Sequence, residues 1–260
     1  MRLMLLGDPV DHSLSPAIQN AALRAASLPG TYEVRAVDES GLRAAFDDIR
    51  SGGIDGANVT MPHKGLAAAL CDELEPTARR AGAVNTLVRV GTGIIGHNTD
   101  VAGIRGAWAD NHLPVDGTVL VLGAGGAAAA ALLALEERDL AIAVRRPGTG
   151  AALAAKVGVE AREVSWGEAV WDASVVNCTP IGMHQESLPE RVIAAASGLF
   201  DMAYSLRPTP SVTEARGRSL PVGDGADMLI GQGAAAFRLW VGMAADTVAM
   251  RAALERETAR

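Results

Sequence analysis

The sequence predicts an α/β fold of two domains, and three observations support this prediction. The chain has 260 residues, which is long for one compact domain and short for three. Segments with the spacing of strands and of helices alternate along it, as they do around a mostly parallel sheet. Residues 118–122 form a nearly continuous apolar run, typical of a strand covered on both faces. We therefore expect two α/β domains, with a boundary near residues 100–105.

In the first half, short apolar runs alternate with segments of helical spacing. Ser15 and Ser40 are suited to cap the first two helices, because a serine side chain accepts hydrogen bonds from free amides at a helix start. The expected elements are a strand at 3–6, a helix at 16–27, a strand at 32–37, a helix at 40–51, a strand at 56–60, helices at 64–71 and 75–81, and a hairpin of 83–90 with 93–96.

The second half begins with a helix after Asp100 that can bridge the domains. The elements expected after it are a strand at 118–122, an alanine-rich helix, a strand at 140–144, a helix at 151–157, strands at 173–178 and 198–203, and one long helix from 228 to about 257. Leu229, Phe237, Val241 and Val248 lie on one stripe of this last helix.

The composition restricts the class of protein and of partner. Hydrophobic residues make up 49% and charged residues 20% of the chain, as in ordinary soluble proteins. A formal net charge of −7 argues against nucleic acid, because phosphate binding along a backbone needs a basic face. No run reaches the roughly 18 apolar residues of a membrane span, and the apolar run at the N-terminus is too short for a signal peptide. Cys71 and Cys178 lack metal or redox spacing, so we expect no metal and a cytoplasmic protein.

A glycine loop follows the strand at 118–122. Its pattern, G-x-G-x-x-A between a strand and a helix, is typical of dinucleotide binding. Gly123 allows a tight turn, Gly125 lets the backbone approach a pyrophosphate, and Ala128 permits close helix packing. Free amides at the helix start would bind the phosphates. The alternative is a plain strand–turn–helix corner, but the context favours the nucleotide.

Arg145 and Arg146 indicate which nucleotide. Sites for NAD usually place a carboxylate at the end of the second strand, whereas the strand at 140–144 ends in these two arginines. Guanidinium groups suit a 2′-phosphate, which accepts paired charge-assisted hydrogen bonds. The alternative is two solvated arginines on a loop. We expect NADP.

Lys64 and Asp100 are candidates for proton transfer. Each follows a predicted strand, where open α/β sheets place ligands. Reduction of a ketone by hydride needs a proton donor for the forming alkoxide, and a lysine held by a carboxylate can be that donor. Hydroxyl and amide side chains that could line a site for a polyhydroxylated acid are Ser13, Ser15, Asn58, Thr60, Asn85 and Gln232. Caps and turns are the alternative explanation for these polar residues.

Several segments together resemble the shikimate dehydrogenase family. They are Gly7–Pro9, His12–Pro16, Asn58–Lys64, Ala83–Leu87, Asn98–Asp100, Gly123–Ala127, Asn177–Met183, Asp201–Tyr204 and Met228–Gln232. They occur in the family's order and span nearly the whole chain. The segment around Lys64 is the most specific of them and the glycine loop is the least.

The resemblance implies an NADP-dependent dehydrogenase that interconverts 3-dehydroshikimate and shikimate in aromatic amino-acid biosynthesis. Lys64 and Asp100 would be the catalytic pair. The substrate carboxylate would bind Ser13 and Ser15 with Tyr204 nearby, and the ring hydroxyls would bind Asn58, Thr60, Asn85, Asp100 and Gln232. The cofactor residues would be Gly123, Ala124, Gly125, Gly126, Ala127, Arg145, Arg146, Thr179 and Met183.

The resemblance also implies the domain organisation. Residues 1–100 with 226–260 would form a substrate-binding and catalytic α/β domain, completed by the returning C-terminal helix. Residues 101–225 would form a doubly wound Rossmann-type domain that binds NADP. We expect a monomer or a homodimer that binds a small-molecule substrate and neither nucleic acid nor membrane.

Two departures from the family pattern bear on subfamily and substrate. Val144-Arg145-Arg146 stands where NADP-binding members commonly carry Asn-Arg-Thr, and Gln19 replaces a frequent histidine. Quinate and an aminoshikimate remain alternative substrates. A non-catalytic sensor of shikimate is an alternative from another class, but it predicts loss of Lys64 or Asp100, and both are present. A folate-linked dehydrogenase disagrees with the Ser-x-Ser loop.

Overall fold

The computed structural model describes residues 1–203 and 207–259. This part of the chain divides into two compact units. The first unit comprises Met1–Gly103 and Leu229–Arg260, and the central unit comprises Ile104–Met228. The chain leaves the first unit within helix α5 (Thr99–Asp110) and returns to it within α10 (Gly225–Val241). The first unit is therefore discontinuous in sequence.

The first unit contains a mixed sheet. Its strands are β1 (Arg2–Gly7), β2 (Thr31–Ala36), β3 (Gly56–Val59), β4 (Glu73–Leu74), β5 (Thr86–Val90) and β6 (Gly93–His97). Their order is β2-β1-β3-β5-β6-β4. β1 is parallel to β2 and β3, whereas β5 is antiparallel to both β3 and β6. The predicted hairpin is thus part of this sheet.

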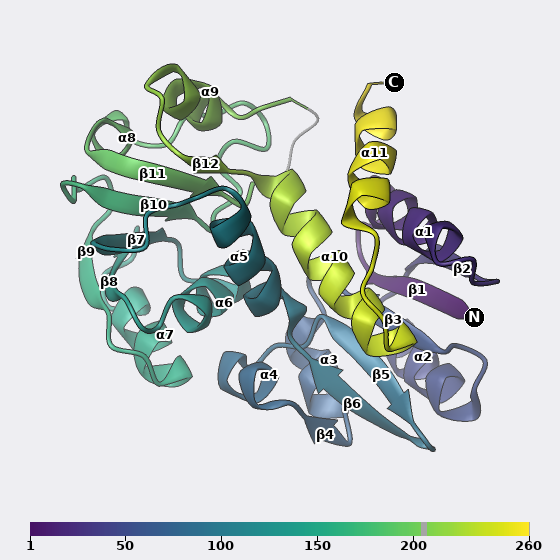
Figure 1. Ribbon diagram of the computed structural model, residues 1–260. Coiled ribbons are helices and arrows are strands. Elements are labelled where there is room, and N and C mark those ends of the chain that lie inside the picture. Colours follow the sequence, from purple (N-terminus) through teal and green to yellow (C-terminus); the bar gives the residue numbers. More distant parts are fainter. Residues whose placement is uncertain (204–206, 260) are drawn as a thin grey trace. The chain divides into compact units, whose positions relative to one another are not determined.

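Helices cover both faces of that sheet. One face packs against α2 (Glu39–Ser51), α3 (Lys64–Leu70) and α4 (Pro76–Ala81) through a core that includes Leu6, Phe46 and Ile94. On the other face, Leu3, Leu5 and Tyr32 are buried with Trp240 of α10 packed against them. Helix α1 (Ser15–Ala25) lies alongside α11 (Thr247–Thr258), as Figure 1 shows. The C-terminal helix therefore completes the first unit.

The central unit is doubly wound. All neighbouring strands of its sheet are parallel, in the order β9-β8-β7-β10-β11-β12. The strands are β7 (Thr118–Leu122), β8 (Asp139–Val144), β9 (Arg162–Ser165), β10 (Ala173–Asn177), β11 (Ala196–Asp201) and β12 (Val222–Gly223). The chain order reverses between β7 and β10, and ligands of open α/β sheets bind at the strand ends beside such a reversal. The predicted fold class is confirmed.

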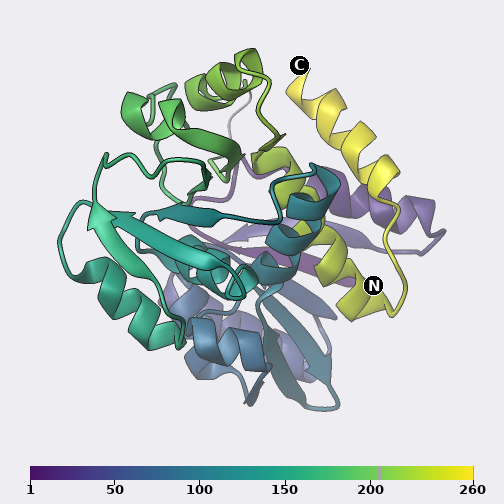
Figure 2. The ribbon, with the colours of Figure 1, turned by 60° about the vertical axis from the view of Figure 1, so that its left-hand side comes forward.

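Helices also cover both faces of the central sheet (Figure 2). α8 (Glu190–Ala194) and α9 (Pro210–Gly217) pack against one face, through Val192, Ile193, Val212 and Ala215. α6 (Gly126–Ala134) and α7 (Thr149–Val157) cover the other face, where Gly150 of α7 lies against Ile142 and Val144 of β8. Because both faces are covered, β7 and β10 are buried along most of their length.

Two predicted helix caps are wrong. Asp38, not Ser40, caps α2: its carboxylate accepts from the Gly41 amide at 2.7 Å and from the Ser40 hydroxyl at 2.8 Å. Aspartate is as good a cap as serine, and its position one residue before the helix lets it take the free amides. Ser15 is the first residue of α1 and not its cap; the cap position is Leu14, which makes no side-chain bond.

The single long helix predicted at the C-terminal end is also wrong. Gly242 has φ +78°, a left-handed conformation that ends α10 and that glycine adopts without steric cost. Asp246 then caps α11, accepting from the Ala249 amide at 2.9 Å. The apolar stripe continued through the break, so helical spacing alone did not indicate it.

Candidate active site

Lys64 and Asp100 form an ion pair in the first unit. The Lys64 Nζ atom lies 2.6 Å from Asp100 Oδ2, and the exposed fractions of the two side chains are 26% and 9%. Lys64 is the first residue of α3, and Asp100 lies in the first turn of α5. The sequence-predicted pair is brought together, and the ammonium remains accessible to a ligand.

The turn before Lys64 is fixed by backbone and ring contacts. The buried His63 ring donates from Nε2 to the Val37 carbonyl at 2.7 Å, which ties the turn to the end of β2. The His63 amide bonds to the Thr60 carbonyl, and the Thr60 amide bonds to the Leu6 carbonyl. These contacts hold Lys64 at the carboxyl end of β3, beside the end of β1.

Asn85 connects the ion pair to the neighbouring strand β5 through Thr86. Its Nδ2 donates to Asp100 Oδ1 at 2.8 Å, so each carboxylate oxygen has a donor. Its Oδ1 accepts from the Thr99 amide and hydroxyl and from the Thr86 hydroxyl. Asn85 is buried, and its second Nδ2 hydrogen has no acceptor among the described residues. That hydrogen is free for a ligand.

A chain of hydrogen bonds continues from Asn85 through Asn58 to Tyr32. Asn58 donates to the Thr86 hydroxyl at 2.9 Å and to the Asn85 carbonyl at 3.0 Å. Asn58 Oδ1 accepts from the buried Tyr32 hydroxyl at 2.8 Å. Burial raises the pKa of Tyr32, so the phenol stays protonated. Asn58 therefore has only one Oδ1 lone pair left for a ligand.

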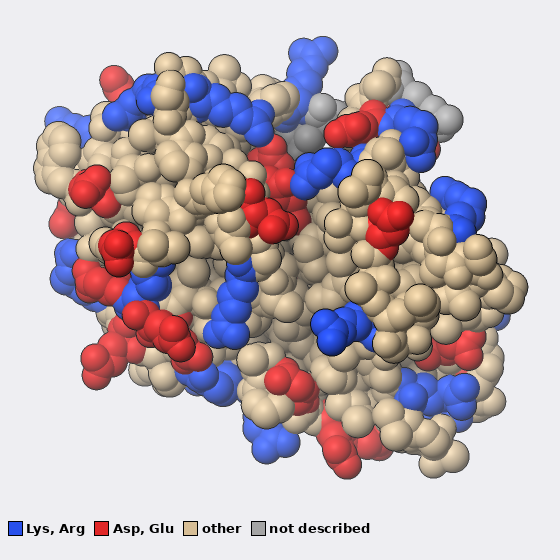
Figure 3. Space-filling model, viewed as in Figure 1, with Lys and Arg blue, Asp and Glu red and all other residues tan. Residues whose placement is uncertain are grey.

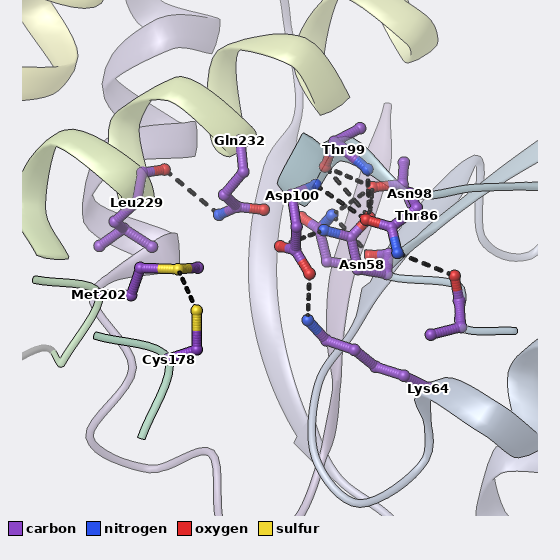
Figure 4. Close-up of polar contacts among 12 residues, drawn as sticks. Asn58, Lys64, Thr86, Asn98, Thr99, Asp100, Cys178, Met202, Leu229 and Gln232 are labelled. Carbon is purple, nitrogen blue, oxygen red and sulfur yellow. Dashed lines mark hydrogen bonds and ion pairs between the residues drawn. The ribbon is translucent and has the colours of Figure 1, made fainter. Parts of the chain in front are cut away.

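The other predicted substrate residues lie around this network in different ways. Ser13 Oγ accepts from the Ser15 amide at 3.2 Å. The Thr60 hydroxyl has no partner among the described residues, and its methyl group lies where a side chain on Gly7 would be. Gln232 of α10 donates to the Leu229 carbonyl, and its amide extends toward Asp100 (Figure 4). Tyr204 lies outside the described residues.

The glycine loop of the central unit has room for a ligand. Gly123 has φ +107°, and an added Cβ would lie 3.1 Å from Thr179, so glycine is needed there for the turn itself. An added Cβ at Gly125 or Gly126 would meet no described atom, and Gly125 has an extended conformation open to any residue. Packing therefore does not explain these two glycines, whereas a phosphate close to the backbone does. Ala128 is fully buried, as close helix packing requires.

Arg145 and Arg146 follow β8 and are exposed. Neither guanidinium has a hydrogen bond or ion pair with the residues that the structure describes. Their donors, like the glycine loop, lie at the carboxyl edge of the central sheet, where a dinucleotide phosphate would be bound. These residues fit NADP.

Asn177 and Asp201 hold the two loops that follow β10 and β11. Asn177 donates to Asp201 Oδ1 and to the Ile181 carbonyl, and accepts from the amide and hydroxyl of Thr179. Asp201 accepts from the Thr209 hydroxyl at 2.6 Å. Burial raises the pKa of Asp201. Thr179 is thus fixed at the strand end, while the Met183 side chain is exposed.

Several residues of these networks had no role assigned from the sequence, among them Tyr32, Thr86, Thr99, Asn177 and Asp201. Thr86 and Thr99 sit inside recognised segments, next to Asn85 and Asp100, and that proximity is a signal for them. Tyr32 gave no local signal, because its partner Asn58 is 26 residues away. Across the described residues, no group of three or more histidine, cysteine or acidic side chains is arranged to hold a metal ion.

Comparison with family models gives two matches. Residues 5–87 match the model described as the shikimate dehydrogenase substrate binding domain. Residues 225–255 match the model described as the shikimate 5′-dehydrogenase C-terminal domain. The two matches include Lys64 in the first case and Gln232 in the second.

Curated relatives match over nearly the full length. The chain is 38% identical over 261 residues to a protein of Thermus thermophilus named shikimate dehydrogenase (NADP(+)), covering 98% of each chain. It is 39% identical over 264 residues to a protein of the same name from Anaeromyxobacter, covering 96% of this chain and 94% of that one.

Solved structures have the same fold. Shikimate 5-dehydrogenase of Thermus thermophilus in complex with NADP(H) and shikimate superposes with a TM-score of 0.91 at 36% identity, covering 98% of this chain and 99% of that one. A shikimate dehydrogenase in complex with NADP+ superposes with a TM-score of 0.92 at 31% identity, covering 100% of this chain and 96% of that one.

Proposed function

The chain belongs to the shikimate dehydrogenase family, and we propose that it interconverts 3-dehydroshikimate and shikimate with NADP(H). The resemblance found in the sequence motifs is confirmed, and with it the prediction of an NADP-dependent oxidoreductase of aromatic amino-acid biosynthesis. The observation that carries the proposal is the Lys64–Asp100 ion pair, because this pair supplies the proton chemistry that reduction of a ring ketone needs.

Lys64 and Asp100 have distinct roles in the proposed reaction. NADPH held by the central unit would supply the hydride for the ketone carbon. Lys64 then donates a proton to the oxygen that becomes an alkoxide, and takes a proton from the hydroxyl in the reverse direction. Asp100 orients the ammonium at 2.6 Å and compensates its charge. Asn85 keeps the Asp100 carboxylate in place through Oδ1.

The remaining side chains of the first unit bind the substrate in this proposal. Ser13 and Ser15 take the carboxylate, and the family resemblance adds Tyr204, which belongs to residues 104–228 of the chain. The ring hydroxyls bind the unused Nδ2 hydrogen of Asn85, the free hydroxyl of Thr60 and the amide of Gln232. Asn58 offers the remaining lone pair of its Oδ1 atom to the substrate, and the same oxygen holds the Tyr32 hydroxyl in place. The support for this assignment is that polar groups without protein partners remain beside Lys64.

Binding of the cofactor falls to the central unit. Gly123 to Ala127 would hold the pyrophosphate, Arg145 and Arg146 the 2′-phosphate, and Thr179 and Met183 the nicotinamide side. In this proposal residues 101–225 form the NADP-binding domain, and residues 1–100 with 226–260 form the substrate-binding and catalytic domain. The open space beside Gly125 and Gly126 supports the cofactor assignment.

The proposed setting is the cytoplasm, as a monomer or homodimer without nucleic-acid or membrane partners. On the face in Figure 3, basic and acidic side chains are interspersed, whereas binding to a nucleic-acid backbone needs a basic face. Within the described ranges, no helix has the length and apolar character to cross a membrane. Cys71 and Cys178 are free thiols, which fits a reducing compartment.

A substrate screen tests the proposal. Purified protein is mixed with NADP or NAD and with shikimate, quinate or an aminoshikimate, and cofactor reduction is followed by absorbance. We expect turnover with NADP and shikimate. Preferred turnover of quinate or the aminoshikimate would reassign the substrate within the family. Binding of shikimate without turnover of any substrate would support the sensor alternative and contradict the proposed activity.

A further inference from the structure

The loop between β8 and α7 carries Arg145 and Arg146 but is not held by its own side chains. Val144, the last residue of β8, is buried and apolar, so it cannot form a hydrogen bond with the loop through its side chain. The turn closes through the Arg146 carbonyl, which accepts from the amide and the hydroxyl of Thr149. Gly148 stands at the cap position of α7 in a left-handed conformation and has no side chain to cap the helix.

Glu163 of the neighbouring strand β9 supplies the missing cap. Its Oε1 accepts from the Gly148 amide at 2.6 Å, and its Oε2 accepts from the Ala151 amide at 2.8 Å. Gly148 is the cap residue of α7 and Ala151 is the third helical residue. These are the two amides that a capping box within one helix normally satisfies. Hydrogen bonds from the Gly148 and Ala151 amides lower the pKa of Glu163, so it is ionised at neutral pH.

The backbone at Gly150 leaves room for the Glu163 carboxylate. A Cβ on Gly150 would lie 2.9 Å from Glu163 Oε2 and 2.9 Å from Ile142 Cγ2. Glycine at this position therefore lets the carboxylate reach the start of α7. The contact joins β9, the first turn of α7 and the loop that carries the two arginines.

We propose that Glu163 is a positioning residue for recognition of the 2′-phosphate of NADP(H), because it clamps the Arg145–Gly148 loop through the start of α7. This inference rests on the proposed role of Arg145 and Arg146. Glu163 occupies two backbone amides that could otherwise bind an anion, so binding of the 2′-phosphate depends on the arginine side chains. The positions of these side chains depend in turn on how the loop backbone is held.

The clamp and the charge of Glu163 have opposite effects, which makes the proposal testable. As a clamp, the carboxylate strengthens phosphate binding by ordering the loop. As a nearby negative charge, it would weaken the same binding by repulsion. Glu163→Ala and Glu163→Gln remove the charge and all or part of the clamp. Gly150→Ala keeps the charge but disturbs the contact between the carboxylate and the start of α7, because the new Cβ would lie 2.9 Å from Oε2 and 2.9 Å from Ile142 Cγ2.

The experiment measures calorimetric binding of 2′,5′-ADP and of 5′-AMP, which differ in the 2′-phosphate. Glu160→Gln is the control, because Glu160 is exposed, three residues before Glu163, and has no partner among the described residues. We expect Glu163→Ala and Gly150→Ala to weaken 2′,5′-ADP binding about fivefold or more, with Glu163→Gln intermediate. Binding of 5′-AMP, and kcat at saturating NADP, should change less than about twofold. Thermal unfolding verifies that each variant is folded.

Two results would overturn the inference in distinguishable ways. The first result requires that the unmodified protein binds 2′,5′-ADP strongly. If Glu163→Ala and Gly150→Ala then leave this affinity unchanged, Glu163 does not position the loop. The same conclusion follows if Glu163→Ala and Glu163→Gln increase the affinity. If the unmodified protein binds 2′,5′-ADP no better than 5′-AMP, the role of Arg145 and Arg146 fails, and this inference with it.

Discussion

At the scale of single residues, the proposed chemistry depends on how the Lys64 ammonium is held. One of its hydrogens points to Asp100, and the carboxylate is held from its other oxygen by Asn85. The proton donor is thus fixed by a carboxylate that cannot rotate freely, which is what a positioned acid–base group requires. The other hydrogens of the ammonium remain available to a substrate oxygen.

Replacing Lys64 with alanine should lower kcat by about 10²–10⁴-fold, the usual contribution of a positioned proton donor. Binding of NADP, measured by calorimetry, should be unchanged. Lys156→Ala is the matched control, because Lys156 is the other lysine of the chain and is exposed on α7. Near-normal turnover by the Lys64 variant would show that the ion pair is structural.

Tyr32→Phe should destabilise the protein, although it removes only one oxygen atom. Tyr32 is 1% exposed, and its hydroxyl is the donor to the buried Asn58 Oδ1. Without it that oxygen lacks a donor, at a cost of about 1–3 kcal/mol in the free energy of unfolding. Urea unfolding measures this change. A loss below about 0.5 kcal/mol would mean that another donor replaces the phenol.

At the scale of elements, helix ends determine where side chains are placed. The carboxyl-terminal region is two helices because Gly242 ends one and Asp246 caps the next. The second helix, α11, lies along α1, whose first residue is Ser15. The cap at Asp246 therefore helps to hold the helix that supports the proposed carboxylate site.

Asp246→Ala should lower the free energy of unfolding by about 0.5–2 kcal/mol, because the Ala249 amide loses its acceptor. Asp246→Asn is the matched control, since asparagine caps nearly as well. Urea denaturation of both variants checks this. If Asp246→Asn lowers the free energy of unfolding as much as Asp246→Ala does, the charge of Asp246 stabilises the protein and its capping hydrogen bond does not.

The cap that Glu163 provides for α7 predicts a pH dependence. Backbone hydrogen bonds lower the folded-state pKa of Glu163 below its unfolded value. Its stabilising contribution is therefore present above the unfolded pKa and is lost as pH falls through the folded pKa. We expect the difference in Tm between the unmodified protein and Glu163→Gln to be full near pH 7 and to shrink below about pH 4. A difference that does not change with pH would contradict this.

How much the sequence predicts differs between local and non-local features. The longer strands, the glycine loop and the Lys64 segment are contiguous in sequence, so local patterns indicated them, whereas the short strands β4, β9 and β12 were not expected. The cap by Glu163 could not be predicted, because it lies on a strand whose pairing with β8 is known only after folding. The Tyr32–Asn58 and Asp201–Thr209 contacts depend in the same way on strand register. The predicted caps of α1 and α2 were wrong because neighbouring serine and aspartate residues give overlapping signals. The break between α10 and α11 was missed because the apolar spacing continues through it.

At the scale of the whole molecule, an acidic protein must bind an acidic cofactor. The formal net charge is −7, so the long-range field disfavours NADP. In the proposed site, binding therefore depends on local groups: the start of α6 and the exposed arginines Arg145 and Arg146.

This charge distribution predicts a salt-dependent cofactor preference. At low salt, kcat/KM for NADP should exceed that for NAD by about tenfold or more, because one charge-assisted bond is worth roughly 1.5–3 kcal/mol. The preference should decrease as salt rises, because exposed charges are screened over roughly 10 Å at 0.1 M. Steady-state kinetics with both cofactors at low and high salt measures it.

The variant Arg145→Asp tests the same prediction from the other side. It should reverse the preference, because a carboxylate repels the 2′-phosphate and accepts from the ribose diol of NAD. Equal use of both cofactors by the unmodified protein would mean that the two arginines face solvent and bind nothing.

The return of the chain to the first unit has a consequence for its synthesis on the ribosome. Met1–Gly103 emerges first, but Trp240, which packs against one face of its sheet, and α11, which packs against α1, belong to residues 229–260. Translation of the intervening residues takes roughly 6–25 s at 5–20 residues per second. During this time Leu3, Leu5 and Tyr32 of the nascent chain lack the Trp240 side chain that packs against them. The central unit, in contrast, is contiguous in sequence and can fold before residues 229–260 are made. Apolar surface exposed in this way favours aggregation until residues 229–260 cover it.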